Sequence, residues 1–266
     1  MRPRSWKVTA AICAWGLMLG GCAQDAPTHP TATGTTPPTE AGPETTPARF
    51  IADDRVVVID PGHNGGNAAQ PAQINRPVPD GRGKTKACNT TGTSAIDGYA
   101  EHEFTWDVAN RVRDALAARG IRVVMTRDDD AGVGPCVDER AAIGNRSGAA
   151  AVVSIHADGA PAGAHGFHVA YSEPPLNSAQ GEPSQLLATT LRDTMIRSGI
   201  TPSTYVGSDG MNPRADLAGL NLSERPVALV ECGNMRDPGD AALIESPDGR
   251  ARYADAITEA IIAFLG

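Results

Sequence analysis

Residues 55–66, RVVVIDPGHNGG, decide the fold because they join a buried strand to a sharp break and a chemically useful side chain. The β-branched apolar run at residues 56–59 is typical of a strand that is buried on both faces. Pro61 lacks an N–H donor and Gly62 tolerates positive φ, so both favour a break directly after this strand. His63 is therefore expected at the carboxyl end of a strand, where open α/β sheets place their ligand sites. This stretch alone leaves open whether His63 binds a ligand or is a structural histidine.

The chain beyond this stretch alternates between expected strands and helices. Apolar runs predict strands at residues 121–126, 151–156, 166–171 and 226–231, and apolar residues at helical spacing predict helices at residues 103–119, 138–146, 184–197 and 252–265. This alternation predicts one three-layer α/β domain over residues 51–266, with a twisted, mostly parallel or mixed sheet flanked by helices. Residues 64–98 are rich in Gly, Pro and Asn and are expected to form a loop, whose length favours a functional role.

Composition narrows the class of protein. The chain has 266 residues, 41% of them hydrophobic, and a net charge of −8 with no basic cluster beyond the amino terminus. A nucleic-acid partner is therefore not expected. Five cysteines without C-x-x-C pairing are too few for a disulfide scaffold and exclude a zinc finger.

The amino terminus has the pattern of a secretion signal at residues 1–22. Three basic residues precede an apolar segment at residues 8–19, which is too short to span a membrane as a mature helix. The segment ends in Leu-Gly-Gly-Cys, which resembles the lipobox of bacterial lipoproteins and marks Cys22 for lipidation; an ordinary secretory signal with a chance cysteine is the alternative. Either pattern predicts a protein of the cell envelope, outside the cytoplasm, either periplasmic or anchored to the membrane only through an N-terminal lipid.

Residues 23–50 follow this signal and are rich in Pro, Thr and Ala, with almost no large apolar side chains. Such a segment buries too little surface to offset its chain entropy, so we expect a disordered tether.

Three polar side chains fall where predicted strands end, namely His63, His156 and Glu231. If these strands are neighbours in one sheet, the three side chains meet in one crevice, which Glu101 can reach from the start of a helix. Two imidazoles and a carboxylate with an open fourth position form the ligand set of a catalytic zinc site. Zn²⁺ accepts this mixed set, whereas Ca²⁺ and Mg²⁺ prefer oxygen ligands.

Four blocks of sequence, in order, resemble the zinc-dependent N-acetylmuramoyl-L-alanine amidases of the amidase-3 family. The blocks are IDPGHNGG (59–66), EHEFTWDVANRVRDAL (101–116), ERAAIGNRSGAAAVVSIHAD (139–158) and RPVALVECGNMRD (225–237). The resemblance implies that His63, Glu101 and His156 bind one Zn²⁺ and that Glu231 is the catalytic carboxylate. It also implies that the chain cleaves the amide bond between N-acetylmuramic acid and L-alanine, in peptidoglycan or in a muropeptide.

Glu101 and not Glu103 takes the ligand position in this comparison, because family helices place the ligand eight residues before an alanine, here Ala109. A carboxylate favoured only by the helix dipole is the structural alternative for either residue. The corresponding alternative for Glu231 is an ion pair with Arg225 or Arg236.

The chain departs from the family pattern in three places. The segment between His63 and Glu101 is longer than usual, and Asp158 stands where asparagine is common. The last block reads ECGNMRD, where the family often has a glycine followed by an aromatic residue. The long segment contains Cys88, and in an oxidising envelope we expect a Cys88–Cys136 disulfide that holds this segment beside the site.

Cys232 is expected to be a packed free cysteine, with a role as zinc ligand as the alternative. The functional alternatives to an amidase are a zinc carboxypeptidase-like metallopeptidase and a non-catalytic peptidoglycan-binding or regulatory protein on the same fold. We expect a monomer that acts without a dedicated activator.

Overall fold

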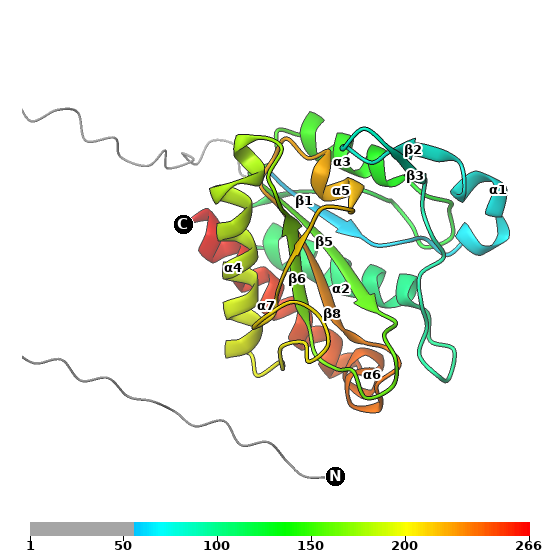
Figure 1. Ribbon diagram of the computed structural model, residues 1–266. Coiled ribbons are helices and arrows are strands. Elements are labelled where there is room, and N and C mark those ends of the chain that lie inside the picture. The colour runs from blue at the N-terminus through cyan, green and yellow to red at the C-terminus, as the bar shows by residue number, and fades with distance from the viewer. Residues whose placement is uncertain (1–55) are drawn as a thin grey trace, which may run out of the picture. The chain divides into compact units, whose positions relative to one another are not determined.

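A six-stranded mixed sheet forms the centre of the protein, of which this computed structural model describes residues 56–266 (Figure 1). Its strands are β1 (Val56–Pro61), β4 (Arg122–Met125), β5 (Ala151–Asp158), β6 (His168–Ser172), β7 (Met211–Arg214) and β8 (Val227–Asn234). They lie in the order β4-β1-β5-β8-β6-β7, and all neighbours are parallel except β6 and β8. The single α/β domain with a mixed sheet, predicted from the alternating pattern, is confirmed.

Helices cover both faces of this sheet. The α-helices of the described residues are α1 (Pro71–Ile74), α2 (Glu101–Ala117), α3 (Val137–Arg146), α4 (Glu182–Arg197), α5 (Ala218–Asn221), α6 (Pro238–Glu245) and α7 (Pro247–Leu265). On one face α7 packs against both α2 and α4, while α3 and α5 lie on the other. Because side chains alternate along a strand, Val57 and Ile59 of β1 join the larger core and Val58 joins the smaller one.

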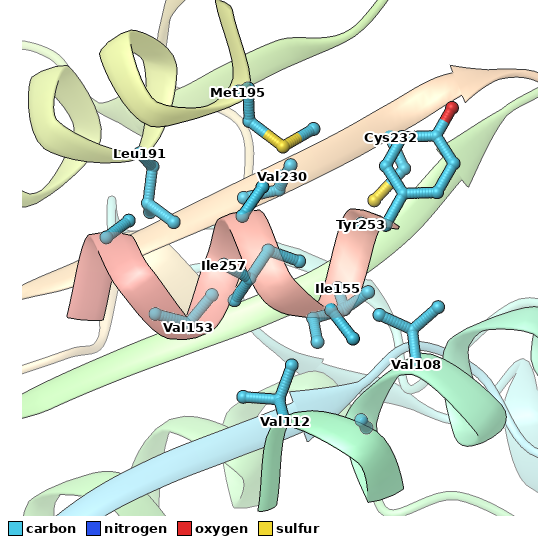
Figure 2. Packing of buried hydrophobic residues seen from close by; sticks show 14 of the residues in the cluster. Val108, Val112, Val153, Ile155, Leu191, Met195, Val230, Cys232, Tyr253 and Ile257 are labelled. Carbon is cyan, nitrogen blue, oxygen red and sulfur yellow. The ribbon is translucent and has the colours of Figure 1, made fainter. Parts of the chain in front are cut away.

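The larger core lies between the sheet and α2, α4 and α7. Figure 2 shows Leu191 and Met195 of α4 beside Val230 of β8, with Ile257 of α7 among them. Cys232 is fully buried in the same core and is a free cysteine. It therefore packs as a small apolar side chain, as expected. Because side chains alternate along a strand, Cys232 and Glu231 lie on opposite faces of β8.

The segment at residues 64–98 is more ordered than the loop expected from its composition. It contains the 3-10 helix η1 (Asn67–Ala69), α1, and a hairpin of β2 (Pro77–Pro79) and β3 (Thr85–Ala87). A disulfide joins Cys88, directly after the hairpin, to Cys136 before α3. The structure thus contains the Cys88–Cys136 bridge expected for an oxidising envelope, and this bridge fixes the segment beside the start of α3.

The signal peptide, the lipidation site Cys22 and the tether at residues 23–50 lie outside the described residues. Within residues 56–266, none of the helices has the length and apolar character needed to cross a membrane.

Candidate active site

The site lies at the edge of the sheet where the parallel strands β1, β5 and β8 end. His63 follows β1 by two residues, and His156 and Glu231 lie opposite each other in the paired strands β5 and β8. His63, His156 and Glu231 therefore lie together, as the sequence predicts, because the carboxyl ends of parallel strands meet at one edge of a sheet.

Glu101, the first residue of α2, completes a compact cluster with the two histidines. Its Oε1 atom lies 3.1 Å from His63 Nε2 and 3.0 Å from His156 Nδ1, and the three ligand-type atoms lie within 4.8 Å of one another. The backbone N–H groups of Thr93 and Ala157 donate to this carboxylate, which is 4% exposed. The carboxylate is therefore buried and fixed at both oxygens.

Glu103, the competing residue on the same helix, is exposed. It is no part of the cluster formed by His63, Glu101 and His156.

The His63 ring is oriented by the loop before α2. Its Nδ1 atom lies 3.1 Å from the carbonyl oxygen of Thr90, so an Nδ1–H donates there and leaves the Nε2 lone pair facing the cluster. The residue has φ +59°, a left-handed conformation that costs a side-chain-bearing residue roughly 1–2 kcal/mol. Such strain persists where the surrounding structure holds the residue in place, and strained residues of this kind cluster at functional sites.

Two glycines leave the room that the cluster needs. A methyl group at Gly62 would lie 2.3 Å from the His156 ring, and one at Gly92 would lie 2.9 Å from Glu101 Oε2 and 3.0 Å from the His63 ring. The sequence indicates Gly62 only as a strand breaker and does not single out Gly92. The signal for Gly92 was a single glycine within the polar run TTGTS, which is common in loops without any site.

A buried ion pair supports the backbone that carries His63. Asp60 accepts hydrogen bonds of 2.6 Å from Arg140, Thr126 and Ser154, and Arg140 donates to the His63 carbonyl oxygen at 2.7 Å. Burial alone would raise the pKa of Asp60, but the Arg140 guanidinium and the two hydroxyls outweigh it and lower that pKa to about 2. Asp60 is therefore a carboxylate at neutral pH and holds Arg140 beneath the site.

Glu231 is half-buried, and it differs from Asp60 and Glu101 because its buried Oε2 atom has no hydrogen-bond partner among the described residues. Neither proposed arginine pairs with it. Arg225 donates to the carbonyl oxygens of Gly148 and Ala149, and Arg236 is exposed. Glu231 is thus an unpaired carboxyl group in the interior of the site.

The surroundings of Glu231 change its acidity. Burial raises the pKa of Glu231 well above its usual value, and the negative charges of Glu101 and Asp158 raise it further. A carboxyl group with a raised pKa in a cavity is suited to accept a proton and return it near neutral pH.

A cavity of about 440 Å³ opens over this set of side chains. It is lined by the four polar residues above, by Asp158, and by apolar side chains from α3, α5 and the sheet that include Val137, Val152, Leu220 and Leu229. Lys86 and Ala87 of β3 border it as well. The site can therefore hold a ligand with both polar and apolar parts against the cluster.

The remaining histidines among the described residues lie outside the cluster. His102 pairs with Asp130 at 2.8 Å. His168 is buried and lies 3.3 Å from Asp158, and its hydrogen bond lowers the pKa of that carboxyl group. No pattern in the sequence predicts this second pair.

Comparison with known proteins points to one family. The family model described as N-acetylmuramoyl-L-alanine amidase matches residues 57–263. An N-acetylmuramoyl-L-alanine amidase of Mycobacterium tuberculosis is 51% identical over 220 residues, which cover 83% of this chain and 89% of that protein.

Solved structures agree with this match. The N-acetylmuramyl-L-alanine amidase of Mycobacterium smegmatis has a TM-score of 0.77 and 56% identity, covering 79% of this chain and 96% of that one. The apo form of the corresponding amidase of Mycobacterium abscessus has a TM-score of 0.78 and 53% identity, covering 81% of this chain and all of that one. Together with the fold and the strand-end site, these matches show that the chain belongs to the N-acetylmuramoyl-L-alanine amidase family known as amidase-3.

Proposed function

We propose that this amidase hydrolyses the bond between N-acetylmuramic acid and L-alanine in peptidoglycan with one Zn²⁺ held by His63, Glu101 and His156. The observation that carries the proposal is the convergence of these three side chains, from separate segments, beside the unpaired carboxyl group of Glu231.

The donor set fits zinc. Two imidazoles and one carboxylate form the mixed nitrogen and oxygen set that catalytic zinc sites use, with room for a further ligand. The hydrogen bond from His63 Nδ1 to Thr90 is the outer contact that orients a metal-binding histidine. Gly62 and Gly92 keep the space around the donors free of side chains. When bound, Zn²⁺ would polarise the scissile carbonyl and lower the pKa of water at the site.

The protein groups supply the proton transfers and the positioning. Glu231 takes the proton from the attacking water and passes it to the nitrogen of the leaving L-alanine, which its raised pKa favours. The Asp60–Arg140 pair holds the His63 backbone through the bond to its carbonyl oxygen. The cavity over the cluster accommodates the muramyl group and the stem peptide.

The other functional hypotheses receive no support from a specific observation. A non-catalytic binder has no need of the unpaired carboxyl group of Glu231 beside the three side chains that can bind a metal ion. A metallopeptidase is disfavoured because the family match extends over residues 57–263.

The proposal also covers the cellular location, the domain bounds and the oligomeric state of the protein. Peptidoglycan lies outside the cytoplasmic membrane, so the signal pattern at residues 1–22 agrees with the substrate. We place the catalytic domain at residues 51–266, as a monomer, after a tether at residues 23–50 that a lipid on Cys22 anchors.

The test is incubation of the purified protein with muropeptide, with and without a chelator, and identification of the products by mass spectrometry. We expect free stem peptide beginning with L-alanine, and no product after chelation. Glu101→Gln removes this activity, while Glu103→Gln, on the exposed side of the same helix, retains it. Trimmed peptides still attached to the sugar, or equal activity of both variants, would refute the proposal.

A further inference from the structure

A second group of polar side chains lies at the edge of the same cavity, around Asp158. Asp158 is the last residue of β5, and its Oδ2 atom accepts a 2.9 Å hydrogen bond from the Tyr205 hydroxyl. His168 Nε2 lies 3.3 Å from the same oxygen, and the N–H of Gly159 donates to Oδ1 at 2.8 Å. Three donors from three parts of the chain thus fix one carboxylate.

The histidine of this group is itself held in place. His168 is 2% exposed, and the Asn212 side-chain amide lies 3.3 Å from its Nδ1 atom. Because the amide nitrogen can only donate, Nδ1 is the acceptor and the ring proton lies on Nε2, which donates to Asp158. His168 also lies opposite Glu231 in the antiparallel pair of β6 and β8, so the network borders the catalytic carboxyl group.

The hydrogen bonds leave one acceptor position of Asp158 free. Each carboxylate oxygen accepts about two hydrogen bonds, and Oδ2 already has Tyr205 and His168 while Oδ1 has only Gly159. Within residues 56–266 no Lys or Arg nitrogen lies within 4.0 Å of this carboxylate, whose side chain is 35% exposed and lines the cavity. A charged acceptor with an open position therefore faces the substrate space.

We propose that Asp158 binds the backbone N–H of the stem-peptide residue that follows L-alanine, with Tyr205 and His168 as its positioning residues. The inference rests on the proposed function. A carboxylate can only accept, so its partner on the substrate is an N–H or O–H group. Asp158 follows the metal-cluster residue His156 by two residues on β5, beyond an irregularity in the pairing with β8, and the amide N–H after L-alanine is one residue, about 3.8 Å, from the scissile bond. The proposal makes Asp158 a specificity-determining residue for the peptide, and the test below distinguishes this role from contact with the sugar.

The test compares two substrates that differ by one group. The first is N-acetylmuramoyl-L-alanyl-D-isoglutamine, and the second is its analogue in which an ester oxygen replaces the isoglutamine N–H. The full-length wild-type protein should cleave the first with a kcat/KM about tenfold higher or more, as expected for a charge-assisted hydrogen bond. Release of the muramyl sugar is measured for both.

Variants of the protein distinguish binding of the substrate N–H by Asp158 from a purely structural role of this residue. Asp158→Ala should cleave the two substrates with equal kcat/KM, and Tyr205→Phe should reduce the preference to a few-fold. Asp158→Asn, which keeps an acceptor oxygen, should restore part of the preference. Asp255→Ala, at an exposed carboxylate of α7, is the control and should keep the full wild-type ratio.

Two results would overturn the proposal while leaving the hydrolase intact. One is a wild-type protein that cleaves both substrates with the same kcat/KM. The other is a preference that is unchanged in Asp158→Ala, whether or not the activity on both substrates falls, which indicates a structural or sugar-binding role. A wild-type protein that cleaves neither substrate refutes the proposed function and this inference together.

Discussion

At the scale of single residues, Glu231 carries the chemistry because its buried Oε2 atom is unpaired and its pKa is raised. Glu231→Gln keeps the shape of the side chain but removes its ability to take and return a proton. We expect kcat to fall by about 10²- to 10⁴-fold with little change in KM, as measured by release of L-alanyl peptide from muropeptide. Zinc content should be unchanged. A variant with near-wild-type kcat would remove Glu231 from the mechanism.

Gly92 provides a second prediction at this scale. Gly92→Ala puts a methyl group 2.9 Å from Glu101 Oε2 at a residue with φ +80°. Gly83→Ala is the matched control, because Gly83 has φ +84° and nothing within 4 Å of the added methyl group. Both variants should lose roughly 1–2 kcal/mol of stability from the left-handed backbone, but only Gly92→Ala should lose activity and zinc affinity. Equal activity of the two variants would contradict the account of the cluster.

At the scale of elements, the Asp60–Arg140 pair connects β1 to α3 beneath the site. Since the pKa of Asp60 is about 2 in the folded protein, below its ordinary value of 3.8, the pair stabilises the fold above about pH 4. This contribution, about 2 kcal/mol, is lost as the pH falls from about 4 toward 2. The stability difference between wild type and Asp60→Asn, measured by urea unfolding, should therefore shrink over this range. A difference that is constant with pH would refute the assignment.

The Cys88–Cys136 bridge connects the hairpin segment to α3 across a separation of 48 residues. Closing a loop of this length stabilises a fold by about 4 kcal/mol in the chain-entropy model. Reductant should lower the free energy of unfolding of the wild type by an amount of this order. The double variant Cys88→Ala/Cys136→Ala should already be destabilised and insensitive to reductant. Three titratable thiols at Cys88, Cys136 and Cys232 in the denatured, unreduced mature protein would disprove the bridge.

The elements that could be predicted are those whose residues carry a strong local pattern. The strands β1, β5 and β8 are apolar runs because they are buried on both faces. The edge strand β7, Met211–Arg214, cannot be predicted because it is short, contains Pro213 and shows no alternation. The hairpin of β2 and β3 cannot be predicted because each of its strands has only three residues, and its order comes from tertiary contacts.

At the scale of the whole molecule, the sheet order explains why the main site residues could be predicted and the surrounding ones could not. His63, His156 and Glu231 follow from the rule that strand ends meet, since β1, β5 and β8 are adjacent. The contacts from Thr90 and Gly92 come from a loop whose course no local pattern reveals.

In the whole fold, three distant segments meet to hold one metal ion. The zinc content of the purified native protein, measured by elemental mass spectrometry, tests this arrangement. We expect one zinc per chain, and loss of that zinc in His63→Ala and in Glu101→Gln but not in Glu103→Gln. A native, fully folded protein without stoichiometric zinc, or with the same zinc content in all these variants, would contradict it.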